Sequence, residues 1–276
     1  MREERLKKIL LAAAAGLTSI FCLAPFIYMV LTSLSGNPDF LLPTKSFTLT
    51  LANFTAVIFS ESAHFMAYLR NSLIISAVAA VASVFLASLA AYSLTRLPLP
   101  GKTVLLLSIL ALSMFPPISL ISYLFKIMSG LGWVNTYAGL ILPYIAWTMP
   151  LSLWILVSYF AQVPMDLDRS ARIDGASRFQ TLIKIILPVA APGVFSTALL
   201  VFIFAFNEFL FALMLTVDYR SRTIPVGIAL FEGIHGQIPW GEIMAAATIT
   251  TIPVVILTLI FQKRIVQGLT RGAVKQ

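Results

Sequence analysis

The sequence predicts an all-α membrane protein with six transmembrane helices and a charged cytoplasmic loop between helices four and five. Of its 276 residues, 59% are hydrophobic and only 11% are charged, whereas soluble domains carry about a quarter charged residues. Six stretches reach the roughly 20 apolar residues that a helix needs to cross a bilayer. We therefore expect one polytopic transmembrane domain over residues 1–276, with the lipid bilayer as its solvent.

Each predicted span has its own character. The first follows a basic N-terminal segment, and its apolar run exceeds the about 7–15 residues of a signal-peptide core, so we expect a retained span. The second is rich in Ala and Ser, which suits close packing within the bundle or at a subunit interface. Pro116-Pro117 break the third, Pro143 and Pro150 bend the fourth, and Pro253 bends the sixth. The predicted spans are residues 9–34, 72–94, 103–125, 137–160, 193–216 and 242–266.

The distribution of Lys and Arg predicts the orientation. With the N-terminus in the cytoplasm, the inner segments hold fourteen of these residues and the outer segments five. This is the bias expected of cytoplasmic loops, and it places both termini and the loop 161–192 in the cytoplasm. The net charge of +8 therefore indicates membrane orientation, and we expect no nucleic-acid partner.

Several chemistries are excluded by the residues present. Cys22 is the only cysteine, so no disulfide and no thiolate metal cluster can form within one chain. Gly101-Lys102-Thr103 matches the end of a phosphate-binding loop, but Arg96 stands where that loop needs glycine and no strand precedes it. We therefore expect no catalytic residue, no metal site and no cofactor bound by this chain.

The longest charged segment that does not span is the loop 161–192. Apolar residues recur at helical spacing on both sides of Gly175. The pattern predicts a short helix, a turn at Asp174-Gly175, and a second amphipathic helix ended by Pro188. Such a pair cannot cross a bilayer, but it can offer a surface to a soluble partner.

These residues carry a family resemblance. The stretch from Asp168 to Pro188, with Asp174-Gly175-Ala176 and the later Leu187-Pro188, resembles the "EAA" cytoplasmic loop of ABC-importer permeases. It is most similar to the sugar-importer branch that includes maltose and trehalose permeases. In that family the loop sits in a cleft of the ATPase subunit and couples ATP hydrolysis to transport. The resemblance implies that role for Asp168, Arg169, Ala171, Arg172, Asp174, Gly175, Ala176 and Phe179.

One position departs from the family pattern. The family carries Glu-Ala-Ala where this chain has Arg169-Ser170-Ala171, and the family's glutamate pairs with a basic group on the ATPase. Arg169 cannot make that pair. Either Asp168 takes the role one residue earlier, or the contact is rearranged.

The fifth span carries polar residues near its middle. Asn207 and Glu208 follow Phe206 there, and an acidic residue at membrane depth is by default a functional hypothesis. Aromatic faces beside hydrogen-bonding groups suit a sugar, and the family resemblance places this span on the translocation pathway. A structural contact between helices is the alternative for Glu208.

The resemblance also implies partners. These are a second homologous permease subunit, two copies of an ABC ATPase that bind ATP and magnesium, and an extracytoplasmic sugar-binding protein, all at a prokaryotic cell membrane. In the outer segment 217–241, it implies binding-protein contact by Glu232, His235 and Trp240. A solvated loop is the alternative for this segment.

The sequence therefore predicts a transport subunit rather than an enzyme, with ATP hydrolysis on a partner. The expected substrate is a di- or oligosaccharide such as maltose or trehalose, moved by alternating access. A permease for glycerol-phosphate or an amino acid is an alternative. An ion-coupled secondary transporter would need several intramembrane carboxylates or histidines, and only Glu208 is so placed.

Overall fold

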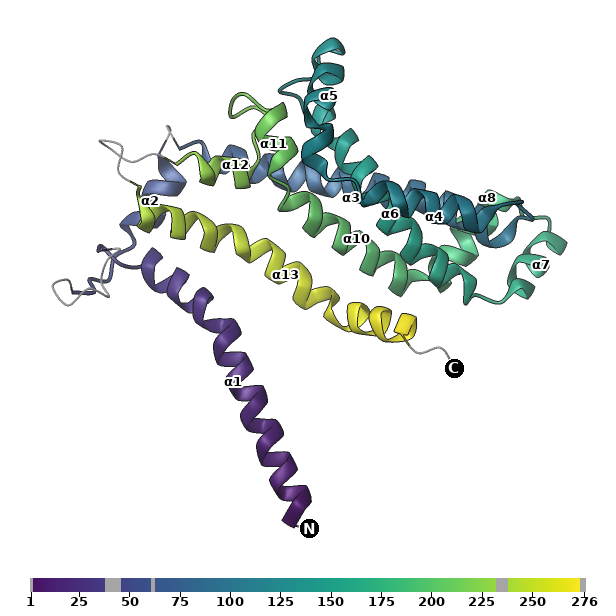
Figure 1. Cartoon of the computed structure of the whole chain (residues 1–276), viewed down its shortest axis with the longest axis horizontal. Helices are drawn as coiled ribbons and strands as arrows, with labels where there is room; N and C mark the ends of the chain where they lie inside the picture. Colours follow the sequence, from purple (N-terminus) through teal and green to yellow (C-terminus); the bar gives the residue numbers. More distant parts are fainter. Residues whose placement is uncertain (1, 38–45, 61–62, 232–237, 274–276) are drawn as a thin grey trace. The chain divides into compact units, whose positions relative to one another are not determined.

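The computed structural model of the chain describes residues 2–37, 46–60, 63–231 and 238–273, and it is built of helices (Figure 1). Within these ranges the extended pairing is limited to an isolated bridge between Ser35 and Leu49. The chain divides into two compact units, Met1–Phe65 with Ile228–Ile252, and Met66–Gly227 with Pro253–Gln276. The predicted all-α class is confirmed.

The first unit contains α1 (Arg2–Ser33) and α2 (Ala52–Phe59), and it shares α13 (Trp240–Ala273) with the second. α1 runs as one helix through Pro25, and proline is tolerated within membrane-spanning helices. The Asn53 amide donates to the carbonyl oxygens of Ser33 at 2.9 Å and Ser35 at 3.0 Å. These bonds fix α2 against the chain that leaves α1.

The second unit is organised around α3 (Phe65–Arg96), α6 (Tyr137–Ala161) and α10 (Ala191–Phe206). Small residues of α3 are buried in its core, as the Ala- and Ser-rich composition predicts. The Thr148 hydroxyl donates to Ser83 Oγ at 3.0 Å across the α3–α6 contact. At Gly193 a side chain would collide with the ring of Tyr159, so this glycine permits the close approach of α10 to α6.

Two bends interrupt the helices of the second unit. α4 (Lys102–Ser113) and α5 (Pro117–Gly130) meet at 90°, where Pro116 is extended and Pro117 begins the new helix. A bend of 86° separates Arg178–Val189 from α10. In the described residues four helices are long and apolar enough to cross a membrane, or up to six if each bent pair counts as one span. The exact limits of the spans stay a prediction.

The loop between α6 and α10 forms a helix pair, as predicted. α7 (Met165–Ile173) precedes the turn, and α8 (Arg178–Thr181), the π-helical η1 (Leu182–Ile186) and α9 (Leu187–Val189) follow it. Pro188 does not end the second helix, which continues to Val189. Proline has no N–H to donate to the previous turn, and the wider π turn just before it alters the hydrogen-bond pattern locally.

The apolar run predicted as the fifth span is also interrupted. α10 ends at Phe206, and α11 (Leu210–Leu215) begins after a break that contains Asn207 and Glu208. A short helix, α12 (Ile224–Ala229), follows. The break exposes backbone groups that polar side chains must satisfy, and it therefore determines the setting of Glu208.

Candidate functional site

The turn at Gly175 is a regular helix end. Gly175 has a φ of 82°, a left-handed conformation that glycine adopts without steric cost. The Ala176 N–H donates to the Ala171 carbonyl at 2.9 Å, and the Gly175 N–H donates to the Arg172 carbonyl at 3.1 Å. This pair of bonds is the Schellman motif, which fixes the direction in which the chain leaves α7.

The second helix starts with a capping box. Ser177 Oγ accepts from the Gln180 N–H at 3.2 Å, and Gln180 Oε1 accepts from the Ser177 N–H at 2.8 Å. The Ser-x-x-Gln spacing is a known sequence signal for this cap, and our sequence analysis missed it. The cap and the Schellman turn together give the helix pair a defined shape.

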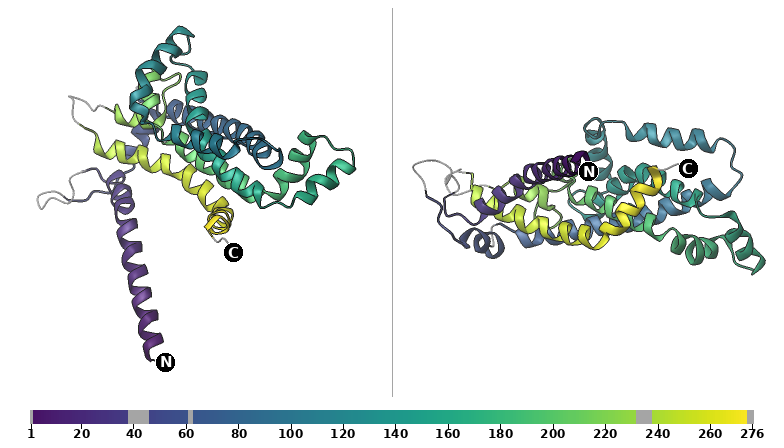
Figure 2. Two further views of the ribbon diagram at one scale, coloured as in Figure 1. Left: turned by 45° about the vertical axis from the view of Figure 1, so that its right-hand side comes forward. Right: turned by 90° about the horizontal axis from the view of Figure 1, so that it is seen from below.

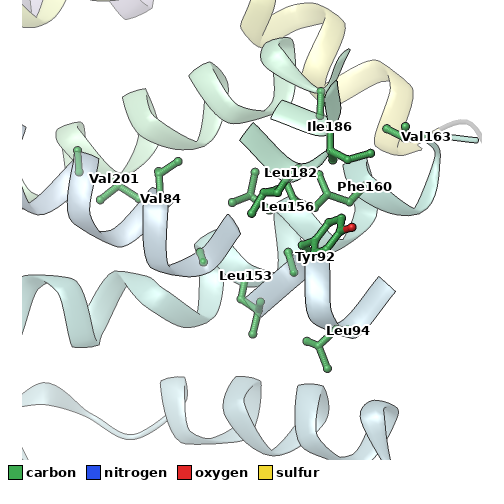
Figure 3. Packing of buried hydrophobic residues seen from close by; sticks show 14 of the residues in the cluster. Val84, Tyr92, Leu94, Leu153, Leu156, Phe160, Val163, Leu182, Ile186 and Val201 are labelled. Carbon is green, nitrogen blue, oxygen red and sulfur yellow. The ribbon is translucent and has the colours of Figure 1, made fainter. Parts of the chain in front are cut away.

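The inner face of the second helix belongs to the core of the bundle. Leu182 and Ile186 are fully buried and gather with Leu156, Phe160 and Tyr92 from α6 and α3 (Figure 3). Buried residues of three elements thus interlock in one close-packed cluster, and such packing transmits displacement. The helix pair is therefore continuous with the bundle rather than a separate appendage.

Arg96, at the end of α3, holds the start of the helix pair. Its Nε lies 2.9 Å from Asp168 Oδ2, and the two side chains are 4% and 12% exposed. Its guanidinium also donates to the Val163 carbonyl at 2.8 Å. The Tyr92 hydroxyl donates to the other oxygen of Asp168 at 3.0 Å. The carboxylate of Asp168 is therefore paired with groups of α3 inside this chain and is not presented on the outer surface.

The outer face of the helix pair is basic with apolar side chains beside it. Arg169 makes an exposed pair with Asp166 at 3.2 Å, with side chains 71% and 84% exposed. Ile173 and Phe179 are exposed on either side of the turn. The turn region projects beyond the ends of α3 and α6 in both views of Figure 2. The remaining predicted coupling residues divide into buried Ala171, half-buried Ala176, and exposed Arg172, Asp174 and Gly175.

A polar hollow of about 260 Å³ opens between the helix pair and the end of α3. Its charged lining consists of four guanidinium groups and one carboxylate, and the carboxylate is the one that Arg96 engages. The lining residues are Tyr92, Arg96, Leu97, Met165, Asp168, Arg169, Arg172 and Arg178. The site therefore carries a local excess of positive charge.

Glu208 caps α11. Its Oε1 accepts from the Phe211 N–H at 2.8 Å, and its Oε2 accepts from the Ala212 N–H at 3.1 Å. The buried Tyr144 hydroxyl donates to Oε2 at 2.8 Å. Both carboxylate oxygens of Glu208 thus bind groups of this chain. This arrangement corresponds to the structural contact between helices that the sequence analysis gave as the alternative for Glu208.

A hollow of about 330 Å³ lies beside this cap. Asn207 and Glu208 line it, but Phe206 does not: Phe206 is 2% exposed and stacks on Phe202 in the core, at 5.5 Å between ring centroids. Phe204, 52% exposed, lines the hollow instead. The sequence offered no way to tell which of these rings faces inward. The lining residues are Tyr144, Trp147, Thr148, Ile203, Phe204, Ala205, Asn207 and Glu208.

At the other end of the bundle, Asn135 links two loops of the second unit. Its Oδ1 accepts from the Val217 N–H at 3.0 Å and from Ser221 Oγ at 2.7 Å, and its Nδ2 donates to Asp218 Oδ1 at 3.0 Å. This amide, followed by the Arg220 N–H, holds the pKa of Asp218 below its usual range because both donors favour the charged carboxylate.

The predicted binding-protein contacts are only partly described. Trp240 begins α13 and is exposed, whereas Glu232 and His235 lie outside the described residues. In the described part of the chain, His, Cys, Asp and Glu side chains form no group of three that could hold a metal ion.

The protein-family comparison fits this arrangement. A family described as the binding-protein-dependent transport system inner membrane component matches residues 83–271. The chain belongs to this family. The resemblance to ABC-importer permeases is therefore confirmed, and the chain is a multi-pass membrane component of a transport system.

Two relatives of this permease match all or most of its length. The trehalose/maltose transport system permease protein MalG of Thermococcus litoralis is 57% identical over 276 residues, which is 100% of this chain and 99% of the relative. The trehalose transport system permease protein SugB of Mycobacterium tuberculosis is 44% identical over 229 residues, 83% of each chain.

A solved structure shares the fold. It is a bacterial ABC transporter involved in the import of the acidic polysaccharide alginate, with a TM-score of 0.80 over 95% of this permease and 98% of the other chain. At 20% identity this similarity shows the fold alone.

Proposed function

We propose that this permease translocates a di- or oligosaccharide, such as trehalose or maltose, as a subunit of an ATP-driven importer. The 57% identity to a trehalose/maltose permease over the full chain supports this substrate class. Two copies of a partner ATPase bind ATP and magnesium and hydrolyse the ATP. A second, homologous permease completes the membrane domain, and an extracytoplasmic sugar-binding protein delivers the sugar.

The observation that carries the coupling role is the construction of the α7–α9 helix pair. Its inner face is locked to α3 and α6 by Leu182, Ile186 and the Asp168–Arg96 ion pair. Its outer face leaves Ile173 and Phe179 uncovered. An ATPase that closes on ATP would move this surface, and the shared core would carry the movement to the long helices. The turn lies on the cytoplasmic side, as do both termini.

The hollow beside Glu208 supports a pathway for sugar. Tyr144, Trp147 and Phe204 supply aromatic faces, and Asn207 supplies an amide at the same hollow. Aromatic walls with a few polar groups are typical of small-ligand sites. Glu208 acts there through the break that it caps, and Asn207 takes the hydrogen-bonding role toward the sugar. Trp240, with Glu232 and His235, remains our proposal for contact with the binding protein.

The decisive test is purification of the tagged permease from its native membrane in mild detergent, followed by reconstitution. We expect an ATPase and a second permease to co-purify, and ATP hydrolysis to rise with trehalose- or maltose-loaded binding protein. If ATP hydrolysis rose instead with glycerol-phosphate or an amino acid, the proposed sugar substrate would be wrong. Solute uptake by the permease alone, driven by an ion gradient without ATP, would overturn the importer.

A further inference from the structure

The outer face of the helix pair has the wrong charge for the contact that the sequence resemblance implies. The family's glutamate is replaced by Arg169, and the nearest acidic substitute, Asp168, is buried in its pair with Arg96. Asp168 cannot turn outward without leaving Arg96 as a buried, uncompensated charge, which is strongly unfavourable. The exposed contact at this position is therefore made by guanidinium groups.

We infer that the partner ATPase presents carboxylate side chains to the hollow lined by Arg169, Arg172 and Arg178. This inference rests on the proposed function and reverses the sign of the contact expected from the family pattern. The hollow has a volume of about 260 Å³ and is lined mainly by charged side chains, and this volume is enough for one acidic side chain to enter. Arginine pairs with carboxylate through two parallel hydrogen bonds, so the geometry provides specificity as well as attraction.

The internal acidic residues do not neutralise this hollow. Asp168 is engaged by Arg96, and Asp166 meets Arg169 only as an exposed pair. Exposed pairs contribute little and exchange readily with other partners. A carboxylate of the ATPase would therefore find two or three guanidinium groups held close together by the Schellman turn and the capping box.

The surroundings favour a protein partner over a phosphate. Ile173 and Phe179 follow Arg172 and Arg178 of the hollow directly in the sequence and are exposed, and the turn projects past the ends of α3 and α6 (Figure 2). A lipid headgroup or a free phosphate would leave these two apolar side chains uncovered. A protein surface covers them in the way typical of interfaces, with apolar anchors beside charged groups.

A carbodiimide cross-link tests the chemistry directly. Arg172→Lys keeps the positive charge and adds an amine, and carbodiimide joins an amine only to a nearby carboxylate. In the purified complex we expect a new cross-link from residue 172 to an Asp or Glu of the ATPase, located by mass spectrometry. The wild-type complex is the control, because arginine does not react. Absence of a cross-link from the assembled variant complex would overturn the inference.

Charge reversal provides the second measurement. Arg172→Glu with Arg178→Glu should lower the ATPase recovered per permease at least tenfold, whereas Lys184→Glu should change it less than twofold. Lys184 is the matched control because it is exposed on the same helix pair but does not line the hollow.

The two proposals fail in different ways. Full ATPase recovery by the reversed variant overturns this inference and leaves the importer intact. A wild-type permease that binds no ATPase overturns both. Loss of bound phospholipid from the reversed variant, with ATPase binding unchanged, would assign the hollow to a lipid phosphate instead.

Discussion

The Asp168–Arg96 pair allows a quantitative test of how the helix pair is attached to the bundle. Asp168→Asn removes the charge but keeps an oxygen that can accept from Tyr92. Breaking a buried ion pair typically costs about 3–5 kcal/mol, because the remaining charge is left uncompensated. Arg96 retains its bond to the Val163 carbonyl and borders two hollows that can admit water. We therefore expect the lower end, about 3 kcal/mol.

A double-mutant cycle isolates the pair. Arg96→Met should lower the free energy of unfolding by a similar amount. The double variant should lose about 2 kcal/mol less than the two single variants lose together, because no buried charge remains. The free energy of unfolding can be followed by tryptophan fluorescence during SDS titration in mixed micelles. The matched control is Asp166→Asn with Arg169→Gln, whose exposed pair should couple by no more than about 0.5 kcal/mol.

The cycle has a clear negative result. If Asp168→Asn and Arg96→Met add within about 0.5 kcal/mol, the ion pair does not attach α7 to α3. The helix pair would then be held by the Leu182 and Ile186 cluster and by the Tyr92 hydrogen bond, and the transmission argued from Arg96 would be refuted.

Three further predictions concern single positions. Gly175→Val should lower the free energy of unfolding by about 1–2 kcal/mol, because valine is strained in the left-handed turn, and it should uncouple ATP hydrolysis from transport in vesicles. Gly175→Asn should retain most of this coupling because asparagine tolerates the left-handed conformation, and equal coupling in the two variants would contradict the role of the turn. Glu208→Gln should lower the thermal unfolding midpoint with little change in the transport KM, because its oxygens cap α11; a large change in KM alone would make it a substrate ligand. Because the pKa of Asp218 is lowered in the fold, its contribution to stability is complete above the unfolded pKa of about 3.9 and lost as pH falls through the folded value. Unfolding midpoints measured between pH 2 and 6 should show this component in the wild type and not in Asp218→Asn.

Local sequence signals predicted the features that depend on neighbouring residues. The turn at Asp174-Gly175 was predictable because a left-handed residue strongly favours glycine. The break at Pro116-Pro117 was predictable because proline lacks the N–H that continues a helix. The Ser177–Gln180 cap was equally local, and its spacing is present in the sequence.

Contacts between distant residues were not predictable. Tyr92 and Asp168 are separated by 76 positions, and Tyr144 and Glu208 by 64. In the sequence, Arg96 contributed only to the predicted positive charge of the cytoplasmic segments, and none of its neighbouring residues indicated that it pairs with Asp168. Likewise, Phe204 and Phe206 are the same residue type only two positions apart, and the packing of neighbouring helices decides which ring is buried.

The π-helical residues Leu182–Ile186 have a consequence for how this chain tolerates length changes. A π turn accommodates one residue more than an α turn, and one residue corresponds to about 100° of rotation around a helix. Deleting one residue here would convert the wide turn into an ordinary α turn and leave the flanking helix in register. A deletion in the first turn of α10 has no wide turn to absorb it, and it would turn Gly193 away from the ring of Tyr159. The π turn is therefore the point in this region where the chain can change its length by one residue without turning α10 against α6.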